Sequence, residues 1–292
     1  MTTSMAPGDG VEICYETFGD PADPALLMVN GFTAQMINFD ERLCRHLAGH
    51  GRFVIRYDNR DTGLSTHLDG VEVDLGAVLA AAAGKGDMPA VPYTLSHMAA
   101  DGMAVLDHLG IGSAHVFGTS MGGMIVQTMA IEHPARVATL TSVMSTTNEP
   151  GYFESDPTAM KALMTPPPTE REAFIAATVE RNRLFSSPRY YDAERAAVNA
   201  AAAYDRAFYP EGALRQMAAI RASGHRGEQL PKLHVPTLVI HGRADTLILP
   251  PGGERTAELI PGANLLFLGD MGHDMPEPLW PTIVAAVIAH TG

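Results

Sequence analysis

Short apolar runs that alternate with helix-like segments constrain the fold of this chain most. The runs lie at residues 25–31, 53–58, 114–118, 137–145, 236–242 and 264–269. They are too short for helices and are bounded by glycine or polar residues, which is typical of strands buried on both faces. The clearest helix-like segments are residues 94–110, ending at a glycine, and 121–134, ending at a proline. This alternation predicts an α/β fold with a mostly parallel sheet covered by helices on both faces.

The alternation is interrupted twice. Residues 70–91 are rich in alanine and glycine and intrude between a strand and a helix. Residues 146–231 form a longer interruption with helix-like stretches and no convincing strand. We therefore expect an α/β core of residues 1–145 and 232–292, with residues 146–231 inserted as a helical cap, or lid.

The composition limits the partners and the compartment. The chain has 292 residues, with 20 Lys and Arg against 33 Asp and Glu, a net charge of -13. Such a surface repels phosphate backbones and anionic lipids, so nucleic acid and membranes are poor partners. We see no signal-peptide pattern and no membrane-length apolar run. Cys14 and Cys44 are too few for a disulfide framework and are expected to be buried thiols. We expect a cytoplasmic protein, of undetermined oligomeric state.

The stretch HVFGTSMGGM places glycine two residues before and two residues after Ser120. The pattern G-x-S-x-G follows a predicted buried strand and precedes a predicted helix. In that context the serine lies on a sharp strand-to-helix turn, where glycine fits best because the flanking positions crowd the neighbouring strand and helix. The turn exposes the serine oxygen, and the helix N-terminus favours negative charge that develops there. We therefore predict that Ser120 is a nucleophile.

A serine nucleophile needs a base to accept its proton and an acid to orient that base. With this motif the chain order is serine, acid, histidine. The predicted base is His273, in the loop after the last predicted strand. His290 also comes late but lies two residues from the C-terminus. His241, which ends its own strand, is the second choice, although it breaks the chain order.

The predicted acid is Asp245, just beyond a predicted strand, where a carboxylate can point into the crevice at the carboxyl ends of the strands. Glu149, after an earlier strand, is the alternative. Asp270 and Asp274 flank His273 closely, but neighbours in one short loop rarely face the same ring edge.

Acyl transfer also needs donors for the oxyanion. The first is expected to be the backbone N–H of Met121, the residue after the nucleophile. The second is expected to be the backbone N–H of Phe32, in the stretch NGF that follows a predicted strand. By itself NGF could be a simple turn; together with the predicted triad we interpret it as part of an oxyanion hole.

These residues resemble the α/β-hydrolase superfamily. Within it the chain is similar to bacterial carboxylesterases of the aclacinomycin methylesterase type and to related mycobacterial esterase-like hydrolases. The resemblance covers roughly residues 10–145 and 235–290, and the cap is not covered in detail. The stretches that carry it are FGDPADPALLMVNGF, VIRYDNRDTGLS, AHVFGTSMGG, TLVIHGRADTLI and MGHDMP.

The resemblance implies Ser120 as nucleophile, Asp245 as acid, His273 as base, and Met121 and Phe32 as oxyanion donors. The sequence departs from the superfamily at one place. Asparagine precedes glycine where histidine is common, which changes the pocket wall without removing the backbone donor.

The resulting hypothesis is a serine hydrolase that cleaves a small-molecule carboxylic ester through an acyl-enzyme. Methionines and aromatic residues in and beside the cap suit a bulky apolar or aromatic substrate. Carbon–carbon hydrolases, lactonases and perhydrolases share the same triad and stay open as alternatives, as does a non-catalytic ligand-binding relative. No metal-ligand spacing and no phosphate-binding glycine motif occurs, so neither a metal nor a cofactor is expected.

Overall fold

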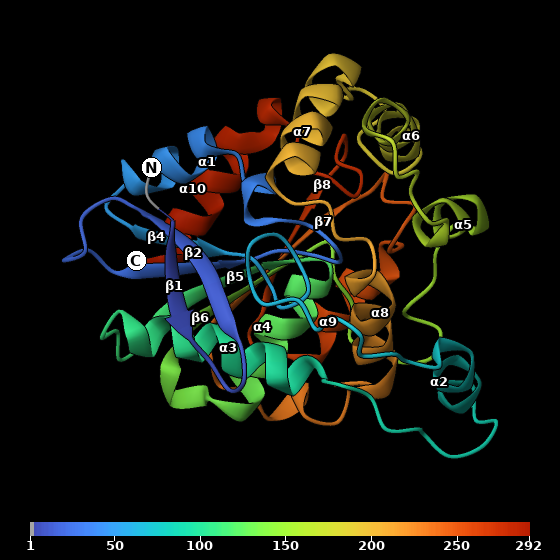
Figure 1. The fold of residues 1–292 in the computed structure, drawn as a ribbon. Helices are drawn as coiled ribbons and strands as arrows, with labels where there is room; N and C mark the ends of the chain where they lie inside the picture. The colour runs from blue at the N-terminus through green and yellow to red at the C-terminus, as the bar shows by residue number, and fades with distance from the viewer. Residues whose placement is uncertain (1–2) are drawn as a thin grey trace.

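A computed structural model describes residues 3–292 and contains one eight-stranded sheet (Figure 1). The strands are β1 (Ser4–Pro7), β2 (Glu12–Phe18), β3 (Ala25–Val29), β4 (Phe53–Tyr57), β5 (Ala114–Thr119), β6 (Val137–Val143), β7 (Thr237–Gly242) and β8 (Asn264–Leu268). Their spatial order is β1-β2-β4-β3-β5-β6-β7-β8. From β4 to β8 all neighbours in this order are parallel. The predicted mostly parallel sheet and its six strands are therefore confirmed.

The first two strands, β1 and β2, were not predicted from the sequence. β1 and β2 pair antiparallel with each other, and β2 pairs antiparallel with β4, so the two form one edge of the sheet. β2 is only partly buried and carries polar residues such as Glu16 and Thr17. A strand of this kind does not show the continuous apolar run by which the inner strands are recognised.

Ten helices are described. They are α1 (Glu41–Ala48), α2 (Leu75–Ala82), α3 (Leu95–His108), α4 (Met121–Glu132), α5 (Pro157–Met164), α6 (Arg171–Arg183), α7 (Ala193–Arg206), α8 (Gly212–Ala222), α9 (Pro251–Leu259) and α10 (Trp280–Thr291). Both helices predicted from glycine and proline stops, now α3 and α4, are present. Within residues 3–292, no helix is long and apolar enough to cross a membrane.

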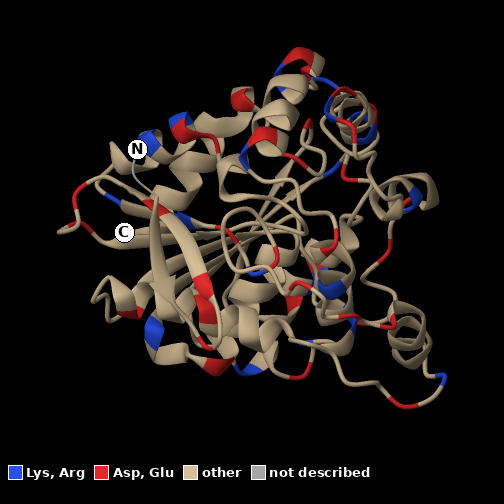
Figure 2. Ribbon diagram, viewed as in Figure 1, with Lys and Arg blue, Asp and Glu red and all other residues tan. Residues whose placement is uncertain are grey.

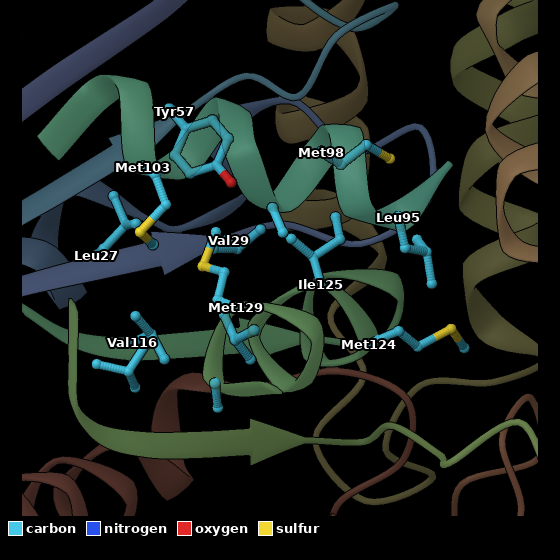
Figure 3. Close-up of a cluster of buried hydrophobic side chains, with 14 of the residues drawn as sticks. Leu27, Val29, Tyr57, Leu95, Met98, Met103, Val116, Met124, Ile125 and Met129 are labelled. Carbon is cyan, nitrogen blue, oxygen red and sulfur yellow. The ribbon is translucent and has the colours of Figure 1, made fainter. Parts of the chain in front are cut away.

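The sheet is covered on both faces. On β3, Leu27 and Val29 belong to one core cluster with residues of α3 and α4, whereas Leu26 and Met28 belong to a second cluster with residues of α1 and α10. This alternation follows from the two-residue period of a strand. Figure 3 shows the first cluster, in which strand side chains face Met98 of α3 and other residues of α3 and α4. The charged residues lie mainly on helices and loops around the sheet (Figure 2).

Residues 146–231, here called the cap segment, contain α5 to α8, and no strand is described in them. In Figure 1, α5 and α6 lie on the opposite side of the molecule from the two chain ends. α8 is largely buried, whereas α6 and α7 each contain one buried residue, Thr178 and Ala200. α2, from the earlier interruption at residues 70–91, packs against α8. Cys14 and Cys44 are buried and not disulfide-bonded.

Candidate active site

Ser120 lies on the turn between β5 and α4 in a strained conformation. Its φ is 56° and its ψ is -118°, a region that residues with a side chain rarely adopt. A Cβ on Gly118 would lie 2.1 Å from the carbonyl oxygen of Gly122, and a Cβ on Gly122 would lie 2.0 Å from that of Val29. Both glycines are therefore required because backbone approaches them too closely for any side chain.

The turn after β3 lies against this serine. A Cβ on Gly31 would lie 3.1 Å from the Cβ of Ser120. Within residues 3–292, no carbonyl or carboxylate accepts a hydrogen bond from the backbone N–H of Phe32 or of Met121. Phe32 and Ser120 line the same cavities. Two free donors thus lie next to the serine.

His273 lies in the loop after β8 and contacts Asp245, which follows β7. Its Nδ1 is 2.7 Å from the Asp245 Oδ2, a hydrogen bond between residues 28 positions apart. No hydrogen bond between the Ser120 Oγ and the His273 ring is found in the described chain, although both residues line one cavity. Hydrogen bonds to a nucleophile are often long in the absence of substrate.

Asp245 is a buried carboxylate with a fixed orientation. The backbone N–H groups of Leu247 and Ile248 donate to its Oδ1, at 2.8 and 2.9 Å. Burial alone would raise the pKa of Asp245, but the His273 and His241 rings lower it to about 2. The carboxylate is therefore ionised at neutral pH and can stabilise a positive charge on His273.

His241, the second-choice base, lies behind Asp245. Its ring is fully buried, and its Nε2 is 2.9 Å from the carbonyl oxygen of Ile248 and 3.5 Å from the Asp245 Oδ2. It does not line either cavity. His241 therefore has no route to a substrate in this arrangement.

The other acids considered are engaged elsewhere. Glu149 forms an ion pair with Arg255 at 3.1 Å, and this pairing lowers the pKa of Glu149. Asp270 pairs with Arg189 on the surface. Asp274 accepts hydrogen bonds from two backbone N–H groups. None of the three is hydrogen-bonded to the His273 ring in the part of the chain that the structure describes.

The loop of residues 58–65, after β4, supports the site, and the sequence analysis gave it no role. The Asn59 Nδ2 donates to the carbonyl oxygen of Asn30, which precedes the turn at Phe32. Asp58 accepts from the backbone N–H of Met36 at 2.7 Å. A run of charged and polar residues directly after a buried strand was the available signal, the same one that identified Asp245.

The same loop joins the core to the cap segment through buried ion pairs. Asp58 lies 2.7 Å from Arg206 of α7, and Asp61 lies 2.8 Å from Arg215 of α8. Both carboxylates are fully buried. Tyr93 also donates to Asp61, so this carboxylate has several partners.

The cap segment also reaches the His273 loop directly. The backbone N–H of His273 donates to the carbonyl oxygen of Phe185 at 2.5 Å, and the Phe185 ring lies edge-on to the imidazole. Ser187 donates its hydroxyl to the carbonyl oxygen of Asp270 and its N–H to Asp274. No local sequence signal reveals these contacts, because the two segments are more than 80 residues apart.

Ser120 and His273 open into a cavity of about 1070 Å³ between core and cap segment. A second, apolar cavity of about 30 Å³ adjoins it and shares Phe32, Ser120, Leu163 and Leu247. Methionine and aromatic side chains in and beside the cap segment line these cavities, among them Met144, Phe153, Met160, Met164, Phe174, Phe185, Phe208, Tyr209 and Met217. The site can thus enclose a ligand of substantial size beside a hydroxyl that can attack a carbonyl carbon.

Comparison with known proteins identifies relatives over the whole chain. Rhodomycin D methylesterase DauP of Streptomyces sp. (strain C5) is 29% identical, with 100% of this chain and 98% of that protein covered. Rhodomycin D methylesterase DnrP of Streptomyces peucetius is 28% identical with the same coverage. The sequence resemblance to methylesterase-type carboxylesterases is thereby confirmed.

Solved structures show the same fold. The esterase RhEst1 from Rhodococcus sp. ECU1013 has a TM-score of 0.75 at 23% identity, with 100% of each chain covered. The enol-lactonase from Burkholderia xenovorans LB400 has a TM-score of 0.74 at 23% identity, covering 98% of this chain and 99% of that one. At such identities these likenesses inform on the fold alone. A family model of the alpha/beta hydrolase fold matches residues 24–277. The chain therefore belongs to the α/β-hydrolase fold family.

Proposed function

We propose that this protein is a serine hydrolase that cleaves carboxylic esters, as a carboxylesterase or methylesterase. The observation that carries the proposal is the Asp245–His273 hydrogen bond of 2.7 Å on the same cavity as the strained Ser120. The two methylesterase relatives, which align over the whole chain, support an ester as the scissile bond.

In the proposed mechanism the Ser120 Oγ attacks the ester carbonyl carbon while the His273 Nε2 accepts the hydroxyl proton. Asp245 keeps the proton on the Nδ1 of His273 and stabilises the imidazolium. The backbone N–H groups of Phe32 and Met121 donate to the oxyanion. His273 then returns the proton to the departing alcohol, and an acyl-enzyme remains on Ser120. A water molecule, deprotonated by His273, attacks the acyl carbon. His273 then gives this proton to the Ser120 Oγ as the bond to the acyl group breaks and the acid is released.

We further propose that residues 1–145 and 232–292 act as the core and residues 146–231 as a cap that holds the bulk of the substrate. The cavity is large enough for a drug-sized ligand, and aromatic and methionine side chains line it. These features favour a bulky apolar or aromatic ester. Lactones and carbon–carbon substrates would use the same three residues, but no observation at the site favours them.

The test measures covalent labelling of Ser120 and turnover together. A fluorophosphonate should add one adduct to the intact protein, located on Ser120 by peptide mass spectrometry, and Ser120→Ala should not be labelled. The same variant should lose about 10³-fold or more of aryl-ester turnover while it stays folded by circular dichroism. A folded Ser120→Ala variant with wild-type turnover would contradict the proposal. Aryl ester, lactone and dienoate substrates assayed in parallel distinguish the three bond types.

A further inference from the structure

One face of α6 lines the large cavity. Phe174, Thr178 and Arg181 are spaced by four and three residues, so they lie on the same side of the helix, and all three line the cavity. Arg183, two positions further, points to the surface, where its side chain is 55% exposed and lies 3.8 Å from Glu180. Arg181 therefore lies on the side of α6 that faces the cavity, whereas Arg183 of the same helix is exposed to solvent.

Arg181 has no protein partner in this position. Within residues 3–292 its guanidinium forms no ion pair and no hydrogen bond, and its buried Nε atom is without an acceptor. Burial lowers the pKa of Arg181, with no neighbouring carboxylate to oppose the effect. Two other arginines that line the cavity behave differently: Arg42 and Arg195 both contact Asp40.

An unpaired, partly desolvated guanidinium is costly for a folded protein. Moving a charge out of water without a partner is unfavourable, and arginine stays protonated in proteins. An anion with two oxygens offsets this cost when it accepts hydrogen bonds from two N–H groups of the guanidinium.

We propose that Arg181 is a substrate-binding residue that holds a carboxylate of the ligand, while Ser120 faces the ester of the same molecule. The inference rests on the proposed function and narrows its substrate class to aromatic esters that carry a second, free carboxylate. The neighbouring Phe174 ring belongs to an aromatic group with Tyr204 and Phe208, which offers flat surfaces to the body of such a ligand.

The first experiment measures binding without turnover. In the Ser120→Ala background, calorimetry compares 2-naphthoate with 2-naphthamide, which has the same shape but no charge. Adding Arg181→Met should weaken 2-naphthoate binding about 10-fold or more and leave 2-naphthamide within about 2-fold, the size expected for a charge-assisted hydrogen bond. The matched control, Arg183→Met on the same helix, should leave both affinities unchanged. Equal binding of the two compounds, or equal losses for both in Arg181→Met, would overturn the assignment.

The second experiment measures selectivity in the active enzyme. Methyl biphenyl-4-carboxylate is used with either a carboxylate or a carboxamide at the 4′ position. Arg181→Met should lower kcat/KM about 10- to 100-fold for the carboxylate ester and at most about 3-fold for the amide, mainly through KM. Arg181→Lys should retain part of the preference for the carboxylate ester, because lysine keeps the positive charge but cannot form the bidentate hydrogen bonds of a guanidinium. If no ester is turned over at all, the proposed function fails, whereas the calorimetry still decides the role of Arg181.

Discussion

The two walls of the large cavity are built differently. The core wall consists of the turns after β3, β5, β7 and β8, where backbone atoms touch: glycines flank Ser120, and two N–H groups orient Asp245. The cap wall includes α6 and α7, which have one buried residue each and are joined by an exposed ion pair between Arg171 and Asp205. The proposed catalytic groups therefore lie on the tightly packed wall, and the proposed ligand-binding residue Arg181 lies on the less buried one.

α8 is the most deeply buried helix of the cap segment. Its inner face is buried, and Arg215 reaches the fully buried Asp61 of the core with two hydrogen bonds of 2.8 and 2.9 Å. Gln216, the next residue, donates to the carbonyl oxygen of Arg60 and accepts from the N–H of Thr33. α8 is thus attached to the loops beside the proposed oxyanion donors. α7 is attached to the core through the Arg206–Asp58 ion pair, whereas the ion pairs of α6 in the described residues are all within the cap segment.

The largest effect is expected from substitution of Asp245, the proposed acid on the core side of the cavity. Asp245→Asn keeps the shape of the side chain but favours the wrong tautomer of His273, so we expect acylation to slow about 10³- to 10⁴-fold. The measurement is the burst of product from an activated ester in stopped flow, with folding checked by circular dichroism.

Three variants serve as controls for that assignment. Glu149→Gln, Asp270→Asn and Asp274→Asn should each cost far less, since none of these carboxylates is hydrogen-bonded to the His273 ring in the described residues. An Asp245→Asn variant within about 10-fold of wild type, beside an inactive Glu149→Gln, would move the acid to Glu149.

The second effect compares a buried ion pair that joins the cap segment to the core with an exposed ion pair inside the cap segment. Arg215→Met leaves the buried carboxylate of Asp61 without its main partner, and we expect the free energy of unfolding to fall by about 3 to 5 kcal/mol. Arg171→Met removes an ion pair on the surface and should leave stability nearly unchanged. Urea unfolding at equilibrium measures both. Similar losses for the two variants would contradict the larger contribution expected of the buried ion pair.

The smallest effect concerns Asp274, where the cap segment meets the His273 loop. Burial raises the pKa of Asp274 to about 6, although the N–H groups of Ser187 and Gly272 donate to it. The folded state therefore binds a proton that the unfolded state, with an ordinary pKa near 3.9, has already lost at pH 5. Asp274 then contributes stability at pH 5 that disappears as the pH rises through about 6.

Asp274→Asn removes this proton uptake. The free energy of unfolding of the variant, relative to wild type, should be about 1 kcal/mol more favourable at pH 8 than at pH 5. Urea unfolding at the two pH values measures this difference. His273 and Asp245 also face this carboxylate, so the comparison is repeated in the Asp245→Asn background. A pH-independent difference between variant and wild type would contradict the raised pKa.

Local patterns in the sequence were sufficient for the inner sheet and the turn at Ser120. β3 to β7 can be recognised because both of their faces are covered, and each can be identified without knowledge of its neighbours. β8 lies at the sheet edge and is partly exposed, but its apolar run identified it as well. The glycines around Ser120 are equally local, since close backbone approach excludes every other residue there. The partly exposed β1 and β2 have no such pattern and were missed.

Contacts between distant segments were decided by tertiary structure alone. Four acids were compatible with the sequence, and the packing of the loops after β7 and β8 brings only Asp245 against the His273 ring among the described residues. Tertiary structure alone also decided that Arg215 pairs with Asp61 and that Arg181 lies on the side of α6 that faces the cavity. A sequence records which residues are charged or apolar. Which charge is neutralised depends on what the folded chain places within about 4 Å of it, and only the three-dimensional packing sets that distance.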